Sequence, residues 1–349
     1  MFLVDALDPR PPRRVAAFGL VVATLVVLGA CQHGFRHSRL PALLSDQEFW
    51  DLVTRLSGPP GPFTHSDNLV SNELLFATTV QGLRPRGGVY LGVGPEQNFS
   101  YIAAIRPDMA FVIDIRQENR NLHLLYKVLF EASADRVEFV FRLFSRERPP
   151  GIGPTASVQD LFGTLAAQRP SRARYEATAR LVRERLVHAH GYALAPADVA
   201  WIESALHAFY SDGPDIHYGR TRPQDPPGPS YRALMTATAL GGRSQSYLAS
   251  EEAFAFVKGL HTRNLIVPVV GDFAGPHAIP RTGDYIRERE GLVSAFYGSN
   301  VEVYLTRRQA AAFCGNLARL PYGPRTWFIH SKGVQRFGPK VSACQAGGS

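Results

Sequence analysis

Hydrophobic residues along this chain follow two spacings, one typical of buried strands and the other of helices with a single apolar face. Short continuous apolar runs that end in glycine or polar residues predict strands of a parallel sheet, which helices cover on both faces. Strand and helix patterns alternate, so we expect an α/β fold with a doubly wound, mostly parallel sheet. The predicted strands are residues 89–91, 111–115, 137–144, 264–270, 292–296 and 326–330.

Apolar positions three and four residues apart predict the helices that connect these strands. The first helix begins at Ser45, which forms a capping box with Glu48, and it ends before Gly58. Two further helices, the second with Pro196 in its first turn, follow a break rich in proline and glycine. They form a helical insertion over about residues 150–245, which we expect to cover or flank a ligand crevice. The predicted helices are residues 45–57, 99–105, 117–131, 172–190, 196–210, 250–260 and 307–319.

A glycine-containing turn lies between the first two predicted strands. Gly92 and Gly94 follow the apolar run 89–91, and the second strand ends at Asp114, about twenty residues further on. A glycine turn after a strand lets a nucleotide approach the backbone without meeting a Cβ atom. An acidic residue at the end of the second strand of such a unit bonds ribose hydroxyls. These residues predict a nucleotide-binding crevice, and the alternative is a plain turn with a solvated strand end.

At these residues the sequence resembles the class I S-adenosylmethionine-dependent methyltransferases, whose first motif is a glycine loop after the first strand. Tyr90 stands where that motif usually opens with an acidic residue, and Gln97 stands where it has a third glycine. The chain also resembles an uncharacterised bacterial family with a methyltransferase-like Rossmann domain, over roughly residues 45–331. The segments that carry this second resemblance are the Gly92 loop and residues 67–73, 113–116 and 296–300.

The resemblance implies S-adenosylmethionine as the cofactor. Methyl transfer depends on the alignment of nucleophile, methyl group and sulfonium more than on a strong acid or base. Replacement of Asp114 by alanine is then expected to weaken cofactor binding while folding hardly changes. The site residues predicted in this way are Gly92, Gly94, Glu96, Gln97, Asn98, Asp114 and Arg116 for the cofactor, Asp272 and Tyr297 for orienting the acceptor, and Asn68, Asn72 and Asn300 for the substrate. For Asn72, capping of the following helix is the alternative role.

The N-terminus carries a pattern typical of export. Arg13 and Arg14 precede an apolar run over residues 15–30, which ends in Leu28-Gly-Ala-Cys31. This end resembles a bacterial lipobox, in which the cysteine becomes the lipidated first residue of the mature protein. An uncleaved membrane anchor is the first alternative. A misassigned start codon, which would leave the protein in the cytoplasm, is the second.

We expect the chain to consist of four parts. Residues 1–31 are expected to be a signal peptide with its lipobox. Residues 32–44, which are basic and without periodicity, would tether a folded domain to a membrane of the bacterial cell envelope. The methyltransferase-like domain is expected over residues 45–333, and the polar, glycine-rich residues 334–349 are expected to be loosely ordered.

Charge and cysteine content limit the partners further. The chain has 349 residues and a formal net charge of +8 from dispersed arginines, so specific nucleic-acid binding is not expected, whereas weak attraction to anionic lipid fits. No Cys/His spacing indicates a metal site, since His188 and His190 would face different sides of a helix. Cys314 and Cys344 could form a disulfide, but a buried free thiol is the plainer expectation for Cys314 within its predicted helix.

Two functions from different classes are compatible with the sequence. The first is an S-adenosylmethionine-dependent methyltransferase or S-adenosylmethionine-binding protein with an unassigned acceptor. The second is a non-catalytic, membrane-anchored lipoprotein that keeps a Rossmann-like fold as a binding or scaffold module. The lipobox conflicts with the first function, because it sends the domain out of the cytoplasm, where S-adenosylmethionine is made. A hydrolase is disfavoured, because the chain has no Gly-x-Ser-x-Gly turn.

Overall fold

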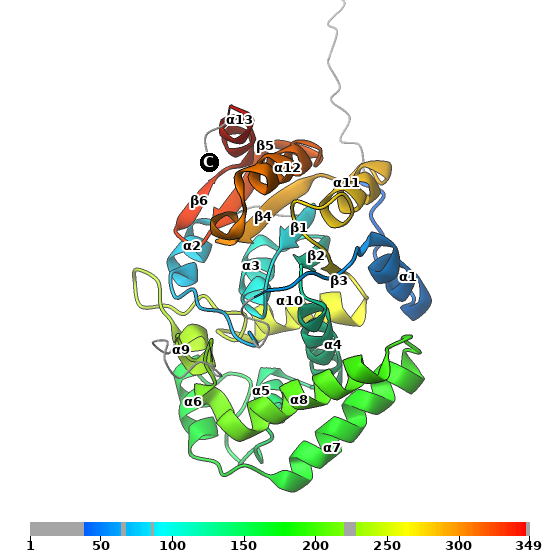
Figure 1. Cartoon of the computed structure of the whole chain (residues 1–349). Helices are drawn as coiled ribbons and strands as arrows, with labels where there is room; N and C mark the ends of the chain where they lie inside the picture. Colours follow the sequence, from blue (N-terminus) through cyan, green and yellow to red (C-terminus); the bar gives the residue numbers. More distant parts are fainter. Residues whose placement is uncertain (1–37, 64–67, 85–86, 220–227, 347–349) are drawn as a thin grey trace, which may run out of the picture. The chain divides into compact units, whose positions relative to one another are not determined.

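The computed structural model describes residues 38–63, 68–84, 87–219 and 228–346. Within them the chain forms a six-stranded sheet in the order β3-β2-β1-β4-β5-β6 (Figure 1). Neighbouring strands from β3 to β5 run parallel, and β6 runs antiparallel to β5. The expected α/β class with a mostly parallel sheet is confirmed, and the strand order is compatible with a Rossmann-like fold. The strands are β1 Val89–Gly92, β2 Met109–Asp114, β3 Ile266–Val270, β4 Val293–Ser299, β5 Tyr322–His330 and β6 Gly333–Arg336.

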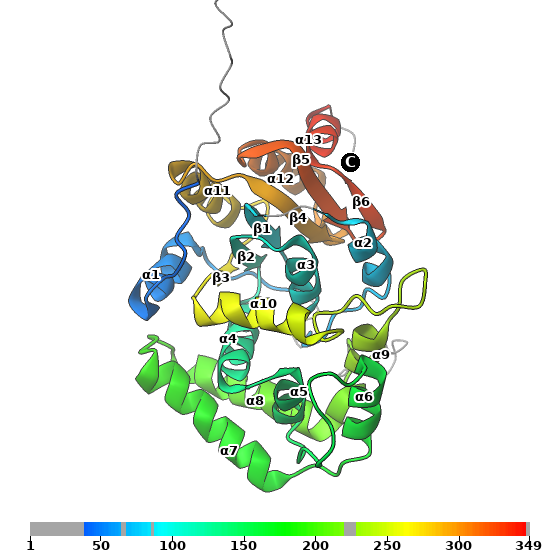
Figure 2. The same cartoon turned by 180° about the vertical axis from the view of Figure 1, so that it is seen from behind.

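Helices cover both faces of the sheet. One face carries α11 Ala278–Glu288, α12 Arg307–Ala318 and α13 Phe337–Gln345 (Figure 1). The other face carries α3 Gln97–Ile105, α4 Gln117–Ala132 and α10 Glu251–Thr262, and Figure 2 shows the same layers from behind. Beside them, α1 Asp46–Leu56 packs on the edge strand β3, and α2 Phe76–Gly82 packs on α3. Because both faces are covered, every residue of β1, β2 and β3 is buried.

Residues 137–144 form a helix up to Leu143, so the strand predicted there is wrong. Helix α5, Arg136–Leu143, begins after Asp135, whose Oδ1 accepts a hydrogen bond from the backbone N–H of Glu138 at 2.7 Å. The β-branched and aromatic residues of this segment are typical of a strand, but the N-cap and the packing against α4 favour a helix. The helical insertion therefore follows the second strand, not a third one.

The insertion between β2 and β3 forms a helical layer beyond α4 and α10 (Figure 1). Besides α5 it contains α6 Val158–Ala166, α7 Arg172–Arg183, a π-helix Glu184–Ala189, α8 Pro196–Asp212, a 3-10 turn Gly213–Asp215 and α9 Tyr231–Thr236. His190 connects this layer to α1 and α4. Its Nδ1 lies 2.9 Å from Oδ2 of Asp46 in α1, and its Nε2 lies 2.9 Å from Oε2 of Glu131 in α4. Among the described residues, no group of three or more His, Cys, Asp or Glu side chains could hold a metal ion.

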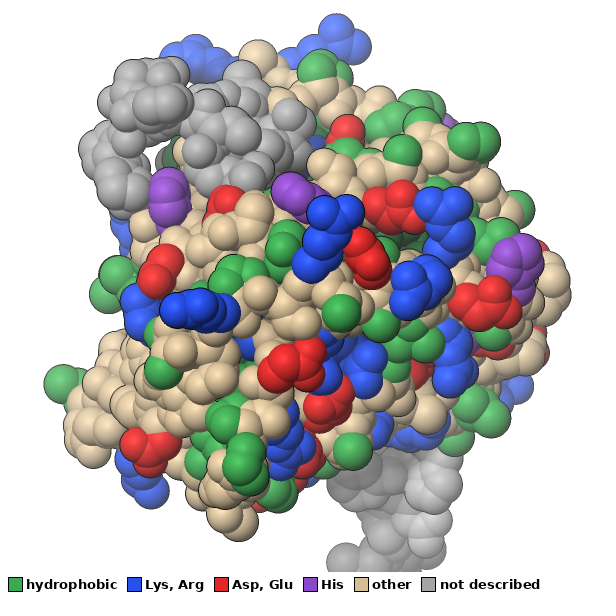
Figure 3. All heavy atoms as spheres, turned by 90° about the horizontal axis from the view of Figure 1, so that it is seen from below, with side chains coloured by type: hydrophobic (Ala, Val, Ile, Leu, Met, Phe, Trp, Pro, Cys, Tyr) green, Lys and Arg blue, Asp and Glu red, His purple; other side chains and the backbone are tan. Residues whose placement is uncertain are grey.

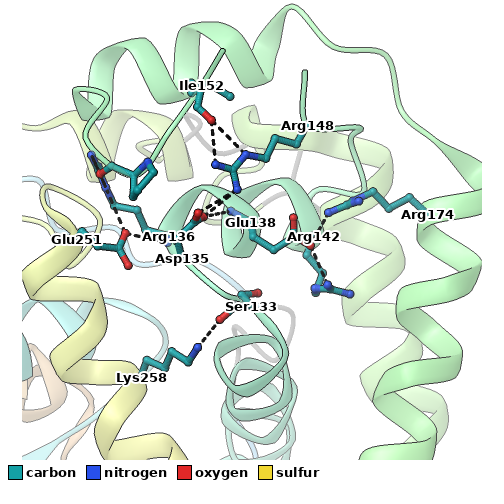
Figure 4. Close-up of polar contacts among 11 residues, drawn as sticks. Ser133, Asp135, Arg136, Glu138, Arg142, Arg148, Ile152, Arg174, Glu251 and Lys258 are labelled. Carbon is teal, nitrogen blue, oxygen red and sulfur yellow. Dashed lines mark hydrogen bonds and ion pairs between the residues drawn. The ribbon is translucent and has the colours of Figure 1, made fainter. Parts of the chain in front are cut away.

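A network of arginines and acids fastens α5 to its neighbours (Figure 4). Arg148 Nη1 donates to both carboxylate oxygens of Asp135, at 3.2 and 3.0 Å. Arg142 from α5 and Arg174 from α7 both donate to Glu138 Oε1 at 2.7 Å. One carboxylate therefore balances two guanidinium groups from different helices. The face of the molecule in Figure 3 likewise shows basic and acidic side chains interspersed, without a large area of one sign.

Replacing Glu138 with alanine should lower the free energy of unfolding by about 1 to 3 kcal/mol, because Arg142 and Arg174 lose their shared acceptor. The side chain of Glu138 is only 20% exposed, so water replaces it poorly. Urea unfolding of residues 37–349, which form one compact unit, measures the change. The control is Glu176→Ala, which removes an exposed pair with Arg172 and should leave stability nearly unchanged. Equal losses in the two variants would contradict the role of the network.

Residues 334–346 are ordered, so the prediction of a loose tail is wrong for them. Strand β6 pairs with β5, and α13 buries Phe337 against that part of the sheet. Cys344 of α13 forms a disulfide with Cys314 of α12, with their Cα atoms 5.5 Å apart. The plainer expectation, a free thiol at Cys314, is therefore wrong. The last three residues lie outside the described part of the chain.

The N-terminal segment is described only in part. The predicted signal peptide, residues 1–31, and the predicted lipidation site Cys31 lie outside the described residues. Residues 38–44 of the predicted tether are described, and there the backbone N–H of Arg39 donates to the carbonyl oxygen of Arg289 at 2.8 Å. In the part of the chain that the structure describes, no helix is long and apolar enough to cross a bilayer.

Candidate functional site

A crevice of about 210 Å³ lies where the first four strands end. The segments that follow β1, β2, β3 and β4 all contribute to its wall. In a sheet of this order the strand sequence reverses between β1 and β4, and ligands bind outside the carboxyl ends of the strands at that point. Eight of the predicted site residues line the crevice: Asn68, Asn72, Gly94, Asp114, Arg116, Asp272, Tyr297 and Asn300.

The two glycines of the loop after β1 have different roles. Gly94 lines the crevice with a φ of +79°, and apart from its chain neighbours no atom lies within 4 Å of the place a Cβ would take. Gly92 does not line the crevice, and a Cβ there would lie 1.9 Å from Asn98 Oδ1 and would also meet Tyr90. Gly94 therefore leaves the backbone open to a ligand, whereas Gly92 permits the close packing of α3 on β1.

Glu96, Gln97 and Asn98 were predicted to contact the cofactor, but they lie behind the crevice and do not line it. Each is at most 2% exposed. Asn98 Nδ2 donates to the carbonyl oxygens of residues 93–95 at 2.7 to 3.0 Å. His123 Nε2 lies 2.9 Å from one of the same oxygens, that of Gly94. A ligand in the crevice therefore meets the backbone of residues 93–95, which the buried side chains hold in place.

Asp114 and Arg116 form a buried ion pair at the end of β2. Arg116 Nε donates to Asp114 Oδ1 at 3.0 Å, and Arg116 Nη2 donates to Oδ2 at 2.9 Å. The backbone N–H of Arg116 also donates to Oδ1, at 2.9 Å. The side chains of Asp114 and Arg116 are 7% and 4% exposed. Arg116 Nη1 donates to the carbonyl oxygen of Asn68 at 3.3 Å, so the pair also supports another segment of the crevice wall.

The two residues predicted to orient an acceptor have different surroundings. Tyr297 is 3% exposed, its hydroxyl accepts a hydrogen bond from Gln97 Nε2 at 3.4 Å, and burial raises its pKa far above the usual range. Asp272 accepts from the backbone N–H of Ala274 at 2.8 Å and has no ion-pair partner in the described chain. Asp272 also lines an adjoining cavity of about 450 Å³. Asp272 is therefore the better placed of the two to contact a ligand.

Aromatic side chains other than the predicted Tyr297 also line the crevice. Phe63, Tyr218 and Tyr304 line it, and the ring centroids of Phe63 and Tyr304 lie 5.2 Å apart. Tyr304 belongs to a 3-10 turn, Val301–Tyr304, that follows β4. The sequence marks the end of β4 through residues 296–300, but it gives no signal that the next turn folds back over the crevice.

Two buried carboxyl groups lie directly behind the crevice wall. The backbone N–H of Ser71 donates to Glu96, and the hydroxyl of Ser299 donates to Glu73. Both serines line the crevice. Burial raises the pKa of Glu96 to about 8 and also raises that of Glu73. The sequence shows these acids in a polar loop and at a helix start, but it does not show that folding removes them from water.

Comparison with known proteins places the chain in a family. It matches a family described as a domain of unknown function (DUF7790) over residues 68–186 and 225–342. These two segments contain all eight predicted residues that line the crevice. A search of curated proteins finds no match. Because the family match covers more than half of the chain, the protein belongs to the DUF7790 family.

Proposed function

We propose that this protein binds S-adenosylmethionine in the crevice, and that its sheet is the doubly wound, methyltransferase-like Rossmann sheet that the sequence predicts. The observation that carries the proposal is the meeting, in one crevice, of the open backbone at Gly94 and the acidic end of β2 at Asp114. In doubly wound sheets the loop after the first strand and the acid after the second contact different parts of one nucleotide. The loop at Gly94 follows β1 and Asp114 ends β2, so the parallel arrangement of these strands brings both to the same edge of the sheet.

The charges and rings of the crevice suit a cationic ligand such as a sulfonium. Among the lining residues that the structure describes, Arg116 is the only basic one, and Asp114 neutralises it. Asp272 adds a carboxylate without a basic partner in that part of the chain, and Tyr304 adds a ring that attracts cations. The Arg116 guanidinium already lies 5.8 Å from the centre of the Phe63 ring. A ligand with phosphate groups would meet no unpaired positive charge among these residues.

Asp114 has only part of its bonding capacity left for a ribose. A carboxylate offers about four lone-pair positions, and hydrogen bonds from Arg116 occupy three of them. The remaining position, on Oδ2, suits a single hydroxyl. Binding of the nucleoside would therefore depend on the aromatic rings and on the backbone of residues 93–95 as well as on Asp114.

If the protein transfers a methyl group, its own residues contribute by alignment. Bound S-adenosylmethionine supplies the electrophilic methyl group. Asp272 lies between the crevice and the adjoining cavity, where it can orient an acceptor and accept its proton. His277 and Gln309 line the adjoining cavity, which is the space available to the acceptor. Tyr297 then has a supporting role, because its hydroxyl is already bonded to Gln97.

The second candidate is a non-catalytic lipoprotein of the bacterial cell envelope that binds another cationic small molecule in the same crevice. The disulfide between Cys314 and Cys344 favours it, since disulfides persist in oxidising compartments outside the cytoplasm. The lipobox-like segment at Cys31 implies the same location. The ion pair that engages Asp114 also favours a site that no longer holds a nucleoside in the usual way.

Calorimetric titration of residues 37–349 with S-adenosylmethionine and S-adenosylhomocysteine separates these functions. Asp272→Asn should weaken binding of S-adenosylmethionine by roughly 5- to 30-fold, because one charge beside the sulfonium is worth about 1 to 2 kcal/mol. Binding of the neutral S-adenosylhomocysteine should not change. The matched control is Asp51→Asn on the exposed side of α1, which should bind like the wild type.

Three outcomes of this titration are informative. A wild type without measurable affinity for either compound would overturn the first proposal and support the lipoprotein. Equal losses for both compounds in Asp272→Asn would show that Asp272 acts by hydrogen bonding and not by charge. A loss in Asp51→Asn would show that the effect arises from the net charge of the protein.

A further inference from the structure

One wall of the crevice is bonded to two buried side chains at the start of α3. Ser71, in the segment between Asn68 and Asn72, donates its backbone N–H to both carboxyl oxygens of Glu96, at 3.2 and 3.3 Å. The hydroxyl of Ser71 donates to Gln97 Oε1. We call this segment the Ser71 wall. Its position therefore depends on residues that do not line the crevice themselves.

A second wall, formed by the end of β4, is bonded to the same place. The hydroxyl of Ser299 donates to Glu73 Oε1. Gln97 Nε2 donates to Glu73 Oε2 at 3.3 Å and to the hydroxyl of Tyr297 at 3.4 Å. Tyr297 and Ser299 both line the crevice, and we call them the β4 wall. The side-chain amide of Gln97 therefore connects the Ser71 wall with the β4 wall.

The acids of this connection are buried, and no described residue supplies a countercharge. Glu96 is 0% exposed and Glu73 is 8% exposed, and neither forms an ion pair in the described chain. His123 of α4, which bonds the loop at Gly94, is itself neutral, because burial lowers its pKa to about 4. A desolvated carboxylate is unfavourable, so burial raises the pKa of both acids. Among the described residues, the other titratable groups that face them are phenols: Tyr126, Tyr231 and Tyr247 at Glu96, and Tyr90, Tyr101 and Tyr297 at Glu73.

We propose that Glu73, Glu96 and Gln97 are positioning residues that hold the Ser71 wall and the β4 wall at a defined separation, and that proton loss from Glu96 favours opening of the Ser71 wall. Opening gives the carboxylate access to water, which the closed arrangement denies it. The role in ligand binding rests on the proposed function of the crevice. The connection itself can be tested without a ligand.

The direction of this pH dependence follows from proton linkage. In the closed arrangement the pKa of Glu96 is about 8, whereas in the open, hydrated arrangement it returns towards the ordinary value of 4.5. Between these two values the open form binds fewer protons, so the opening equilibrium rises with pH, by up to about tenfold per pH unit. Above about pH 8 both forms are ionised, and the dependence on pH ends.

Hydrogen exchange of the backbone amide of Ser71, measured by mass spectrometry of peptides covering residues 68–76, reports this opening in the full chain. After correction for the intrinsic, base-catalysed rate, protection should fall as the pH rises to about 8 and then level off. Glu96→Gln keeps an acceptor for the Ser71 amide but cannot ionise at position 96, so its profile should lose the part of the slope that extends to about pH 8. Glu184→Gln, at an exposed position of the π-helix, is the matched control and should keep the wild-type profile.

A second variant keeps the proposal testable if Glu96→Gln does not fold. Gln97→Leu retains both acids but removes the connection, so protection should fall in residues 68–76 and at the end of β4 together. A flat wild-type profile, a slope up to about pH 8 that Glu96→Gln shares, or a response confined to one wall in Gln97→Leu would each overturn the proposal. Affinity for S-adenosylmethionine should fall over the same pH window. If protection follows the predicted pH dependence but the protein binds no S-adenosylmethionine, the proposed function is overturned and the positioning role of the three residues stands.

Discussion

Replacing Asp114 with alanine should lower the free energy of unfolding by about 3 to 5 kcal/mol, because it removes one partner of a buried ion pair. Arg116 would keep its charge in a site where its side chain is 4% exposed. Its backbone N–H and two of its guanidinium nitrogens would also lose their acceptor. Loss of the carboxylate partner of a buried charge is among the most destabilising results of a single substitution. Urea unfolding of residues 37–349 at neutral pH measures the loss.

The double variant Asp114→Leu with Arg116→Met is the control for lost charge balance. An apolar pair in place of a buried ion pair is often neutral, so this variant should be markedly more stable than Asp114→Ala alone. An Asp114→Ala protein that unfolds at the wild-type urea concentration would show that water reaches Arg116. The sequence alone led us to expect that folding would hardly notice the change, and the buried pair corrects that expectation. A ligand titration with Asp114→Ala therefore requires a melting curve beside it.

Replacing both Cys314 and Cys344 with alanine should lower the free energy of unfolding by about 3 to 4 kcal/mol. The disulfide spans a sequence separation of 30 and joins α12 to α13. In the chain-entropy account a cross-link restricts the unfolded chain, and its effect grows with the length of the closed loop. Because α13 is the last helix and packs on β5, protection from hydrogen exchange should be lost there first. Urea unfolding with and without reductant measures the change.

The reductant supplies the matched control for the disulfide. Dithiothreitol should shift the unfolding curve of the wild-type fragment 37–349 towards that of the double variant, and it should leave the double variant unchanged. Two thiols that react in the folded wild-type fragment without reductant would contradict the disulfide. Material isolated from a cell envelope should carry the bond intact, whereas a cytoplasmic protein should keep both thiols reduced. Measuring whether the two cysteines of the isolated protein are bonded or free therefore also tests the proposed location.

The sequence by itself determined the first three strands and the edge of the sheet at which the crevice lies. Continuous apolar runs suit strands that are covered on both faces, and β1, β2 and β3 are buried at every residue. The capping box of Ser45 and Glu48 likewise starts α1 where it was predicted. Because parallel strands end at one edge of the sheet, Gly94, Asp114 and Asp272 lie around one crevice, as their positions along the chain indicated.

Contacts between distant segments decided two elements that the sequence pattern missed. Residues 137–144 have strand-forming side chains, but packing against α4 and the cap at Asp135 make most of them a helix. Residues 334–346 are polar and rich in small side chains, yet pairing with β5 and the disulfide to Cys314 order them. Both segments are stabilised by contacts with other elements, α5 with α4 and α10, and α13 with β5 and α12, so local periodicity did not reveal their structure.

Only the tertiary structure decided what the polar residues of the site do. Glu96 and Gln97 occupy sequence positions typical of cofactor contacts, yet the docking of α3 places them behind the crevice wall. Asp114 and Arg116 stand two residues apart, and exclusion of water makes each the partner of the other. Whether a polar side chain meets a ligand or another side chain depends on its direction and burial. Spacing along the chain specifies neither, because both are set by how the helices pack on the sheet.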